Sequence, residues 1–329
     1  MATRGSRSRS FSSFVLSYNE LSPTMKRYFS YCSIFPKDSV IDVEKLIRMW
    51  MALGYLGLKE SMSNLELKGK EYFNNLRMRS FFQKYIDEDD KRVLRCKMHD
   101  IVHDFAQFIR KTKRHDQDDS VEARPKGSSL VSQLEEYRSL FCREELPCEL
   151  FDFARRVRVL GLWECNLQVI SLGGGMEKLV HLRLPEGIER LVNLRYLESC
   201  FFPFQIPQGI EKLTSLRTLK EFYAGRHCSK LGYLKGLDQL SGSMTLNINV
   251  HDRQDIDEAW KAKLMNKIHI MSLRIVFFYT MGNTKEEELL RNEVLEALQP
   301  PSNLKTLMIF GYKGTSFPRW ISSCQSNMS

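Results

Sequence analysis

The sequence predicts a two-part chain, an α domain followed by an α/β solenoid of short repeats. The first observation is a repeat: LPEGIERLVNLRYL at 184–197 returns as IPQGIEKLTSLRTL at 206–219, a spacing of 22 residues. A unit of this length forms one strand and one return segment, and it buries its apolar side by stacking on its neighbours. The second is a series of helical apolar patterns before residue 113. The third is the length of 329 residues, which favours two cores.

The first domain is expected to span residues 16–113, after an Arg- and Ser-rich tail at 1–15 that we expect to be disordered. Pro23 suits the first turn of a helix, which should end before Phe35 because Pro36 follows. The apolar positions at helical spacing in this segment are Met25, Tyr28, Phe29 and Cys32.

A second helix is expected to begin after Asp42, a capping residue, and to end at Gly54. Its apolar face is formed by Val43, Leu46, Ile47, Trp50 and Met51. A third helix runs from about Leu65 to Phe81 by its apolar spacing.

Residues 91–98, KRVLRCKM, alternate as a short strand after an acidic turn at 87–90. A further helix is expected from Asp100 to about Lys113, because it has one broad apolar face and charges that suit the helix dipole. Helices followed by a hairpin predict a winged-helix domain. Residues 114–150 are expected to form a linker.

The repeats should occupy residues 151–329, where an L-x-x-L-x-L-x-x-C-x-L frame begins at Val157. This frame predicts a leucine-rich-repeat solenoid. Later strands are expected at 245–250, 271–278 and 303–310, with helices near 259–267 and 284–299. The array lacks a recognisable polar capping repeat, so we expect it to be truncated at its C-terminus.

Composition is typical of a soluble globular protein, with 43% hydrophobic and 27% charged residues. The sequence has no apolar run long enough to span a membrane, and its first twenty residues lack the apolar core of a secretory signal. We therefore expect a cytoplasmic protein without a transmembrane segment. The net charge of +9 is spread along the chain and predicts a solvated basic surface.

Three phrases in the first domain resemble plant disease-resistance proteins: residues 16–56, KGKEYFNNLRMRSFFQ at 68–83 and KMHDIVHDFAQFIR at 97–110. The phrase VLEALQPPSNLKTLMIFGYKGTSFPRW at 294–320 resembles their repeat region. Specifically, the chain is similar to the winged helix (second ARC subdomain) and leucine-rich repeats of coiled-coil-type nucleotide-binding receptors. The resemblance covers about residues 16–329.

That family binds nucleotide mainly through an upstream P-loop, G-x-x-x-x-G-K-[ST]. No such phrase occurs in this sequence, so the chain is expected to be a C-terminal portion of a receptor, and no cofactor is expected for it alone. The resemblance implies ADP or ATP in the full-length family. In that family, the repeats sense a pathogen effector or a guarded host protein, and the exchange of ADP for ATP releases the signalling domain. The expected role is recognition in innate immunity, without enzymatic activity.

Met98, His99 and Asp100 match the family's nucleotide-sensing motif. The resemblance implies that His99 hydrogen-bonds the terminal phosphate of ADP and that Asp100 fixes the local backbone. An imidazole N–H at a helix start is suited to an anion. The alternative is a helix-capping turn that binds no ligand.

Two other hypotheses concern the same domain. His99 and His103 lie one helical turn apart and resemble a zinc motif, with Cys96 as a conceivable third ligand, although Asp100 is shorter than the Glu that such a site needs. A winged helix also suggests DNA binding, but the residues at 43–53 are mostly apolar and include few base-reading side chains, so no specific nucleic acid is expected.

The repeats are expected to bind protein through exposed positions between the frame leucines. The candidate residues are Trp163, Arg183, Tyr196, Phe201 and Tyr223. The partner predicted from the resemblance is a pathogen effector or a guarded host protein. A regulatory decoy that binds the nucleotide-binding domain of an intact receptor is the alternative.

Overall fold

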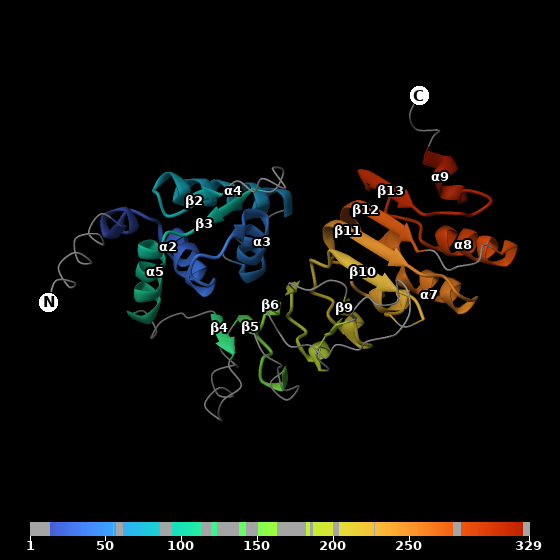
Figure 1. Cartoon of the computed structure of the whole chain (residues 1–329), viewed down its shortest axis with the longest axis horizontal. Helices are drawn as coiled ribbons and strands as arrows, with labels where there is room; N and C mark the ends of the chain where they lie inside the picture. Colours follow the sequence, from blue (N-terminus) through green and yellow to red (C-terminus); the bar gives the residue numbers. More distant parts are fainter. Residues whose placement is uncertain are drawn as a thin grey trace. The chain divides into compact units, whose positions relative to one another are not determined.

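The computed structural model describes twelve segments of the chain and divides it into two compact units (Figure 1). The first unit comprises Met1–Glu122 with Tyr137–Leu140, and the second comprises Ala123–Glu136 with Phe141–Ser329. The described residues are 14–54, 56, 62–85, 94–112, 120–123, 138–142, 151–162, 182–184, 187–199, 204–226, 228–278 and 284–324.

The helices of the first unit begin and end at the residues that local chemistry favours. Helix α2 (Pro23–Tyr31) begins with proline, and its cap Ser22 accepts a hydrogen bond from the Met25 backbone N–H at 3.3 Å. Helix α3 (Val43–Leu53) is capped by Asp42, which accepts from the Lys45 N–H at 3.1 Å, and ends at Gly54 with a φ of 80°. The first two predicted helices are therefore confirmed.

The remaining elements of the first unit complete a winged helix. A three-stranded sheet has the order β1-β3-β2, and both pairings are antiparallel. The β2 and β3 strands form the hairpin wing, and α5 leaves directly after it. The bounds are η1 (Cys32–Ile34), β1 (Ile41–Asp42), α4 (Met62–Met78), β2 (Gln83–Tyr85), β3 (Arg95–Lys97) and α5 (Asp100–Thr112).

Aromatic rings fill the core of this unit. The ring of Trp50 lies 4.5 Å from that of Tyr28, and Phe29 lies 4.6 Å from Phe81. These rings come from α2, α3 and the segment that follows α4, so their burial holds these elements together. Trp50 is fully buried.

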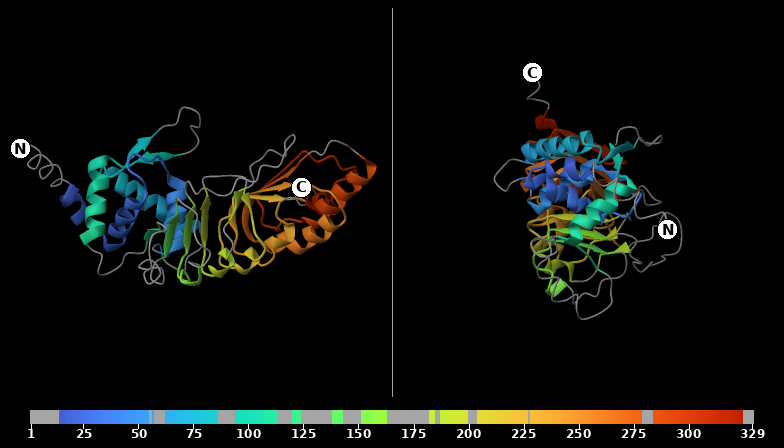
Figure 2. Two further views of the ribbon diagram at one scale, coloured as in Figure 1. Left: turned by 60° about the horizontal axis from the view of Figure 1, so that its bottom comes forward. Right: turned by 90° about the vertical axis from the view of Figure 1, so that its left-hand side faces the viewer.

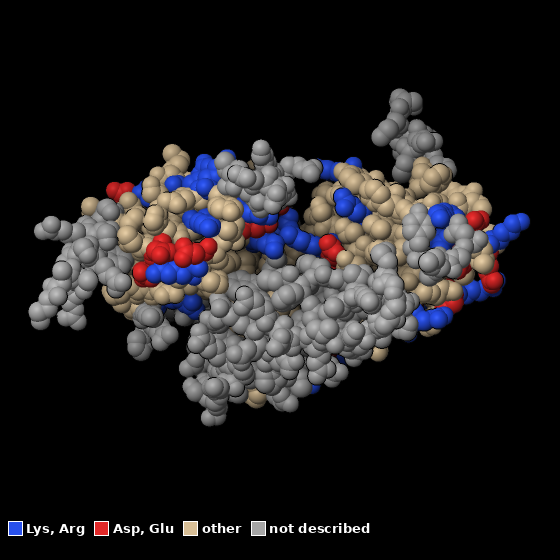
Figure 3. All heavy atoms as spheres, viewed as in Figure 1, with Lys and Arg blue, Asp and Glu red and all other residues tan. Residues whose placement is uncertain are grey.

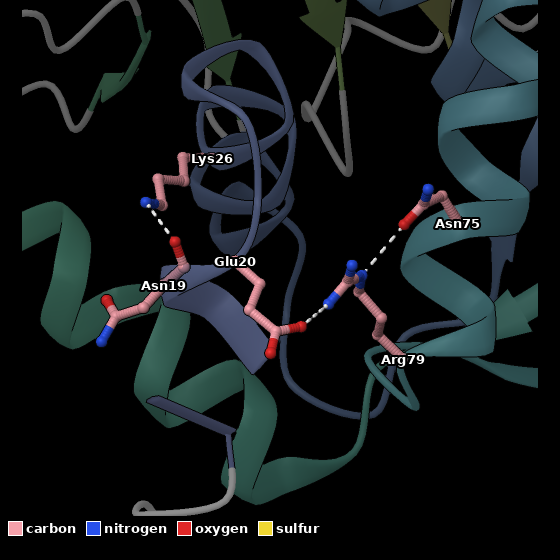
Figure 4. A network of polar contacts seen from close by, with 5 residues as sticks. All are labelled: Asn19, Glu20, Lys26, Asn75 and Arg79. Carbon is pink, nitrogen blue, oxygen red and sulfur yellow. Dashed lines mark hydrogen bonds and ion pairs between the residues drawn. The ribbon is translucent and has the colours of Figure 1, made fainter. Parts of the chain in front are cut away.

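A helix over residues 14–19 packs on the same core. The ring of Tyr18 lies 5.5 Å from both Phe29 and Phe105. Figure 4 shows a polar link beside it: Arg79 pairs with Glu20 at 2.6 Å and donates to the Asn75 side chain at 3.0 Å. Residues 14–15, predicted to lie in the tail, are thus helical, whereas residues 1–13 lie outside the described residues.

The predicted linker at 114–150 contains two described strands. These are β4 (Ser120–Ala123) and β5 (Ser139–Cys142), and they lie where the division between the two units falls. The linker boundaries remain a prediction.

The 22-residue repeat produces two matching turns in the second unit. Gly187 (φ 88°) and Gly209 (φ 102°) adopt left-handed conformations immediately before two 3-10 turns, η4 (Ile188–Arg190) and η5 (Ile210–Lys212). Glycine tolerates this backbone because it has no Cβ. The leucine and isoleucine positions that follow in both copies are fully buried: Ile188, Leu191, Leu194, Ile210, Leu213 and Leu216.

The later repeats form a four-stranded parallel sheet in the order β10-β11-β12-β13. Figures 1 and 2 show α7 and α8 on one side of this sheet. A strand or helix lies at each predicted place, but the helix predicted near 259–267 spans Gln254–Ala262 and is followed by a 3-10 turn. Their bounds are β10 (Glu221–Ala224), β11 (Ser241–Ile248), α7 (Gln254–Ala262), η7 (Leu264–Asn266), β12 (His269–Phe277), α8 (Lys285–Ala297) and β13 (Thr306–Phe310).

Shorter elements surround these strands. The strands β6 and β8 pair in parallel, as do β7 and β9. The bounds are β6 (Val159–Leu162), β7 (Leu182–Arg183), β8 (Tyr196–Ser199), β9 (Phe204–Gln205), η6 (Leu231–Leu234) and α9 (Arg319–Cys324).

Candidate functional site

The Met98-His99-Asp100 motif lies between the wing and the last helix of the first unit. Met98 follows β3 and is buried, so it fixes the position of the connection. His99 and Asp100 are exposed at the start of α5. Within the described residues, neither side chain makes a hydrogen bond or an ion pair. The motif therefore presents an unengaged imidazole and a carboxylate to solvent.

His103, one helical turn later, links α5 to the segment that follows η1 through a hydrogen bond. Its ring is 3% exposed, and Nε2 lies 2.8 Å from the Phe35 carbonyl oxygen. Lys37 in the same segment pairs with Asp104 at 2.8 Å. The half-exposed ion pair contributes little to stability, whereas the part-buried hydrogen bond of the buried His103 ring fixes the relative position of the two segments.

We expect His103→Ala to destabilise the winged-helix unit by about 1–3 kcal/mol, because it removes a buried side chain together with its hydrogen bond to the Phe35 carbonyl. Urea unfolding of the intact chain, with hydrogen exchange resolved for α5, measures the effect. His99→Ala is the matched control on the same helix and should change stability by less than about 0.5 kcal/mol, since its side chain is exposed. Equal effects of the two substitutions would contradict this assignment.

The structure does not favour zinc binding at these histidines. Nε2 of His103 is directed at the Phe35 carbonyl, and its buried Nδ1 has no hydrogen-bond partner. Across the described segments, no group of three or more His, Cys, Asp or Glu side chains is placed to hold a metal ion. Burial, with a smaller contribution from Asp42, raises the pKa of Cys96 to about 12, so this thiol is neutral at physiological pH.

DNA reading by α3 is disfavoured by burial. Leu46, Ile47 and Trp50 lie in the core, so they do not face a major groove. In the view of Figure 3, basic residues on the described surface are interspersed with acidic ones. None of the helices that the structure describes is both long and apolar enough to cross a membrane.

Only part of the predicted protein-binding face lies within the described structure. Trp163 and Phe201 fall outside the described residues, and Arg183 is described through its backbone in β7. Tyr196 is 1% exposed, so its ring packs inside the unit and not at the exposed position that was predicted. Tyr196 is the first residue of β8 and pairs with Val159 of β6, and the side chains of both residues are buried in the core.

Tyr223 is half-buried on β10 with its hydroxyl directed to a neighbour. It donates to Glu221 at 2.7 Å, and its ring stacks with Phe278 at 6.5 Å between centroids. Burial, followed by the hydrogen bond to Glu221, raises the pKa of Tyr223, so the phenol stays protonated and acts as a donor.

Sequence reasoning missed the residues that the sheet aligns with Tyr223. Strand pairing places Asn247, Val276 and Phe310 beside it, one on each of the next three strands. The period-2 alternation of the strands was the available signal, but their mutual register is not visible in the sequence.

A cavity of about 400 Å³ lies beside η5, η6 and α7. Its two carboxylates are already engaged: Glu258 pairs with Lys261 at 2.8 Å and accepts from the Gly232 N–H, and Glu211 accepts from the Gly209 N–H. This cavity therefore presents no unpaired acidic group to a ligand.

Comparison with protein families yields two matches in the order that the structure shows. The family described as "Disease resistance protein Winged helix domain" matches residues 34–106, which contain the His99 motif. The family described as "R13L1/DRL21 LRRs" matches residues 231–329, which contain β11 to β13. The chain thus combines a winged-helix domain with leucine-rich repeats.

Curated relatives extend the similarity to nearly the whole chain. Disease resistance protein RGA2 of Solanum bulbocastanum is 31% identical over 93% of this chain and 34% of its own length. Disease resistance protein RPS5 of Arabidopsis thaliana is 26% identical over 70% of this chain and 27% of its own length. The predicted resemblance to plant disease-resistance proteins is confirmed, and the chain spans about a third of the length of the first of these relatives.

Proposed function

We propose that this chain acts in plant disease resistance as a recognition and switch module without enzymatic activity. Its leucine-rich repeats bind a protein, either a pathogen effector or a guarded host protein. Its winged helix responds to the ADP or ATP held by a nucleotide-binding domain. The observation that carries the proposal is the exposed, unengaged His99 in a winged helix followed by repeats of the disease-resistance type.

The His99 motif supports the nucleotide-sensing part. An exposed imidazole at the start of a 13-residue helix is suited to an anionic phosphate, because the helix N-terminus adds unpaired N–H groups and a favourable dipole. Asp100 repels an anion and is assigned a backbone role. When bound, the nucleotide supplies the negative phosphate that His99 contacts, and the remaining donors come from the nucleotide-binding domain.

The parallel sheet supports protein binding by the repeats. Four consecutive repeat strands align in parallel, and β10, β11 and β12 each have buried positions on one face. We propose that the repeats stack as a solenoid over residues 151–329, because each unit covers the apolar side of the next. The strand face opposite the buried side chains is then the recognition surface.

Calorimetric titration of ADP tests the switch. We expect ADP to bind a P-loop-bearing nucleotide-binding domain of a disease-resistance protein more tightly when this chain is supplied with it. With the His99→Ala variant, we expect ADP to bind about tenfold or more weakly than with the wild-type chain, which is the effect of losing one hydrogen bond to a charged group.

The matched control for this titration is His251→Ala, in the second unit, which should leave ADP affinity unchanged. Equal affinities with the wild-type chain and the His99→Ala variant would overturn the sensing role. Co-precipitation of the same two components tests the decoy alternative, in which the chain binds another receptor's nucleotide-binding domain.

A further inference from the structure

The cavity of about 400 Å³ in the second unit lies beside consecutive return segments of the repeats. Its walls come from η5 and the turn before it, from η6 and the residues on either side, and from α7. A volume of this size is within the range that accommodates small-molecule ligands. Its polar lining includes Gln208, Glu211, Lys230, Tyr233, Lys235 and Glu258.

The carboxylate of Glu258 is fully engaged within the protein. Its Oε1 pairs with Lys261 at 2.8 Å, and its Oε2 accepts from the Gly232 N–H at 3.2 Å. Glu258 is 8% exposed, so these two contacts fix one wall of the cavity. Glu211 accepts from the Gly209 N–H at 2.9 Å through its Oε2. Within the described lining, only the charge of Glu211 opposes an anion without a cation beside it.

Two lysines and a tyrosine of the lining have donors that the described structure does not use. Lys230 and Lys235 are exposed, and among the described residues neither ammonium group makes a hydrogen bond or an ion pair. The hydroxyl of Tyr233 likewise makes no hydrogen bond in this part of the chain. Burial, with smaller contributions from Glu211 and Glu258, raises the pKa of Tyr233, so the phenol stays protonated and can donate.

The charge and the donors of the cavity suit a phosphate monoester. Three lysines and two glutamates line it, so positive charge is in excess. A phosphate monoester carries a charge of about −1.5 to −2 at neutral pH and presents three acceptor oxygens. Lys230 and Lys235 together balance this charge, whereas a carboxylate has a single charge and would leave one of them unpaired.

The remaining polar groups of the lining suit hydroxyl groups next to the phosphate. Oε1 of Glu211 is an acceptor that no described residue uses, and the Gln208 amide both accepts and donates. Glu211 repels a phosphate but accepts from a hydroxyl. The lining therefore favours a ligand that has an anionic part and a separate hydroxylated part.

We propose that this cavity binds a small phosphate monoester of a polyhydroxy compound, in the manner of a sugar phosphate. Lys230 and Lys235 pair with the phosphate, and Tyr233 donates to it. Glu211 and Gln208 accept from the hydroxyl groups. The cavity lies on the return segments and not on the parallel sheet, so this site is separate from the protein-binding surface of the proposed function, and either can fail without the other.

Isothermal titration of glucose 6-phosphate and of ribose 5-phosphate into the intact chain tests the proposal. We expect at least one of them to bind more tightly than inorganic phosphate, and glucose to give no binding at about 10 mM. Simultaneous Lys230→Gln and Lys235→Gln substitutions should weaken the sugar phosphate about tenfold or more, because both charge-assisted contacts are lost. Tyr233→Phe should weaken it about threefold to tenfold.

The matched control removes two other lysines. Lys212 and Lys285 are exposed and lie outside the cavity lining, so their simultaneous replacement by Gln lowers the net charge equally and should leave the affinity unchanged. Equal weakening by the two double variants would show diffuse attraction to a basic surface and overturn the site. Failure of both sugar phosphates to bind the wild-type chain at about 10 mM would also overturn it.

Glu211→Gln should change the affinity in the opposite direction. Gln keeps an acceptor for the Gly209 N–H but removes the charge that repels phosphate, so inorganic phosphate should bind about threefold more tightly. A weaker or unchanged affinity for inorganic phosphate would contradict the placement of the phosphate in this cavity. Lys230 and Lys235 are exposed, so their variants test the site without disturbing the core.

Discussion

Replacement of Trp50 by alanine is expected to lower the free energy of unfolding of the winged-helix unit by about 3–5 kcal/mol. The indole is fully buried and lies 4.5 Å from the Tyr28 ring, so its removal loses aromatic contacts and leaves a cavity between α2 and α3. A loss of this size approaches the whole stability of a small domain. Hydrogen exchange followed by mass spectrometry on the intact chain measures it, through faster exchange of the amides in α3 and α4.

The chain contains a matched control in Trp260, which lies on α7 and is 57% exposed. Trp260→Ala removes the same side chain but little buried area, so we expect a change below about 1 kcal/mol. If both substitutions accelerated exchange equally, the core position assigned to Trp50 would be incorrect.

Gly311→Ala is expected to destabilise the end of the parallel sheet by about 2–5 kcal/mol. Gly311 follows β13 with a φ of 66°, a left-handed conformation that costs an L-residue about 1–2 kcal/mol. A Cβ at this position would also overlap the carbonyl oxygen of Phe277 on β12, which is backbone and cannot rotate away. We expect β13 to separate partly from β12, and faster amide exchange in residues 306–310 would show it.

Gly242→Ala isolates the contribution of the backbone conformation. Gly242 has a φ of 78°, and a Cβ there would meet nothing within 4 Å. Its substitution should therefore cost only the conformational term, about 1–2 kcal/mol. If Gly311→Ala destabilises the protein no more than Gly242→Ala does, the Phe277 carbonyl must shift without breaking the pairing of β12 with β13.

Local chemistry was sufficient to place the helices of the first unit. Asp42 caps α3 through its side chain, which accepts from the Lys45 N–H, and Gly54 ends the helix through its own left-handed backbone, so both act on residues close in sequence. The start of α5 at Asp100 was predicted from the broad apolar face of this helix and from charges that suit its dipole. The capping role of Ser22 was missed, although a serine before Pro23 is a recognisable signal.

Contacts distant in sequence could not be predicted in this way. The hydrogen bond from His103 to Phe35 joins residues 68 positions apart, and helical periodicity shows only that one face of α5 is apolar. The same limit explains the difference between Tyr196 and Tyr223. Tyr196 is in the core and Tyr223 is half-buried. The face that each tyrosine occupies depends on how its strand pairs with strands elsewhere in the chain, which the local sequence does not show.

The linkage of α5 to the Phe35 segment has a mechanical consequence. His99 lies just before α5, and His103 holds the Phe35 carbonyl from the next turn of the helix. A helix is stiff over one turn, so in the proposed function a displacement of His99 on contact with a phosphate is transmitted along α5 to the Phe35 segment. The start of α5 and the connection between η1 and β1 are therefore coupled, through the hydrogen bond of His103 and the ion pair between Lys37 and Asp104.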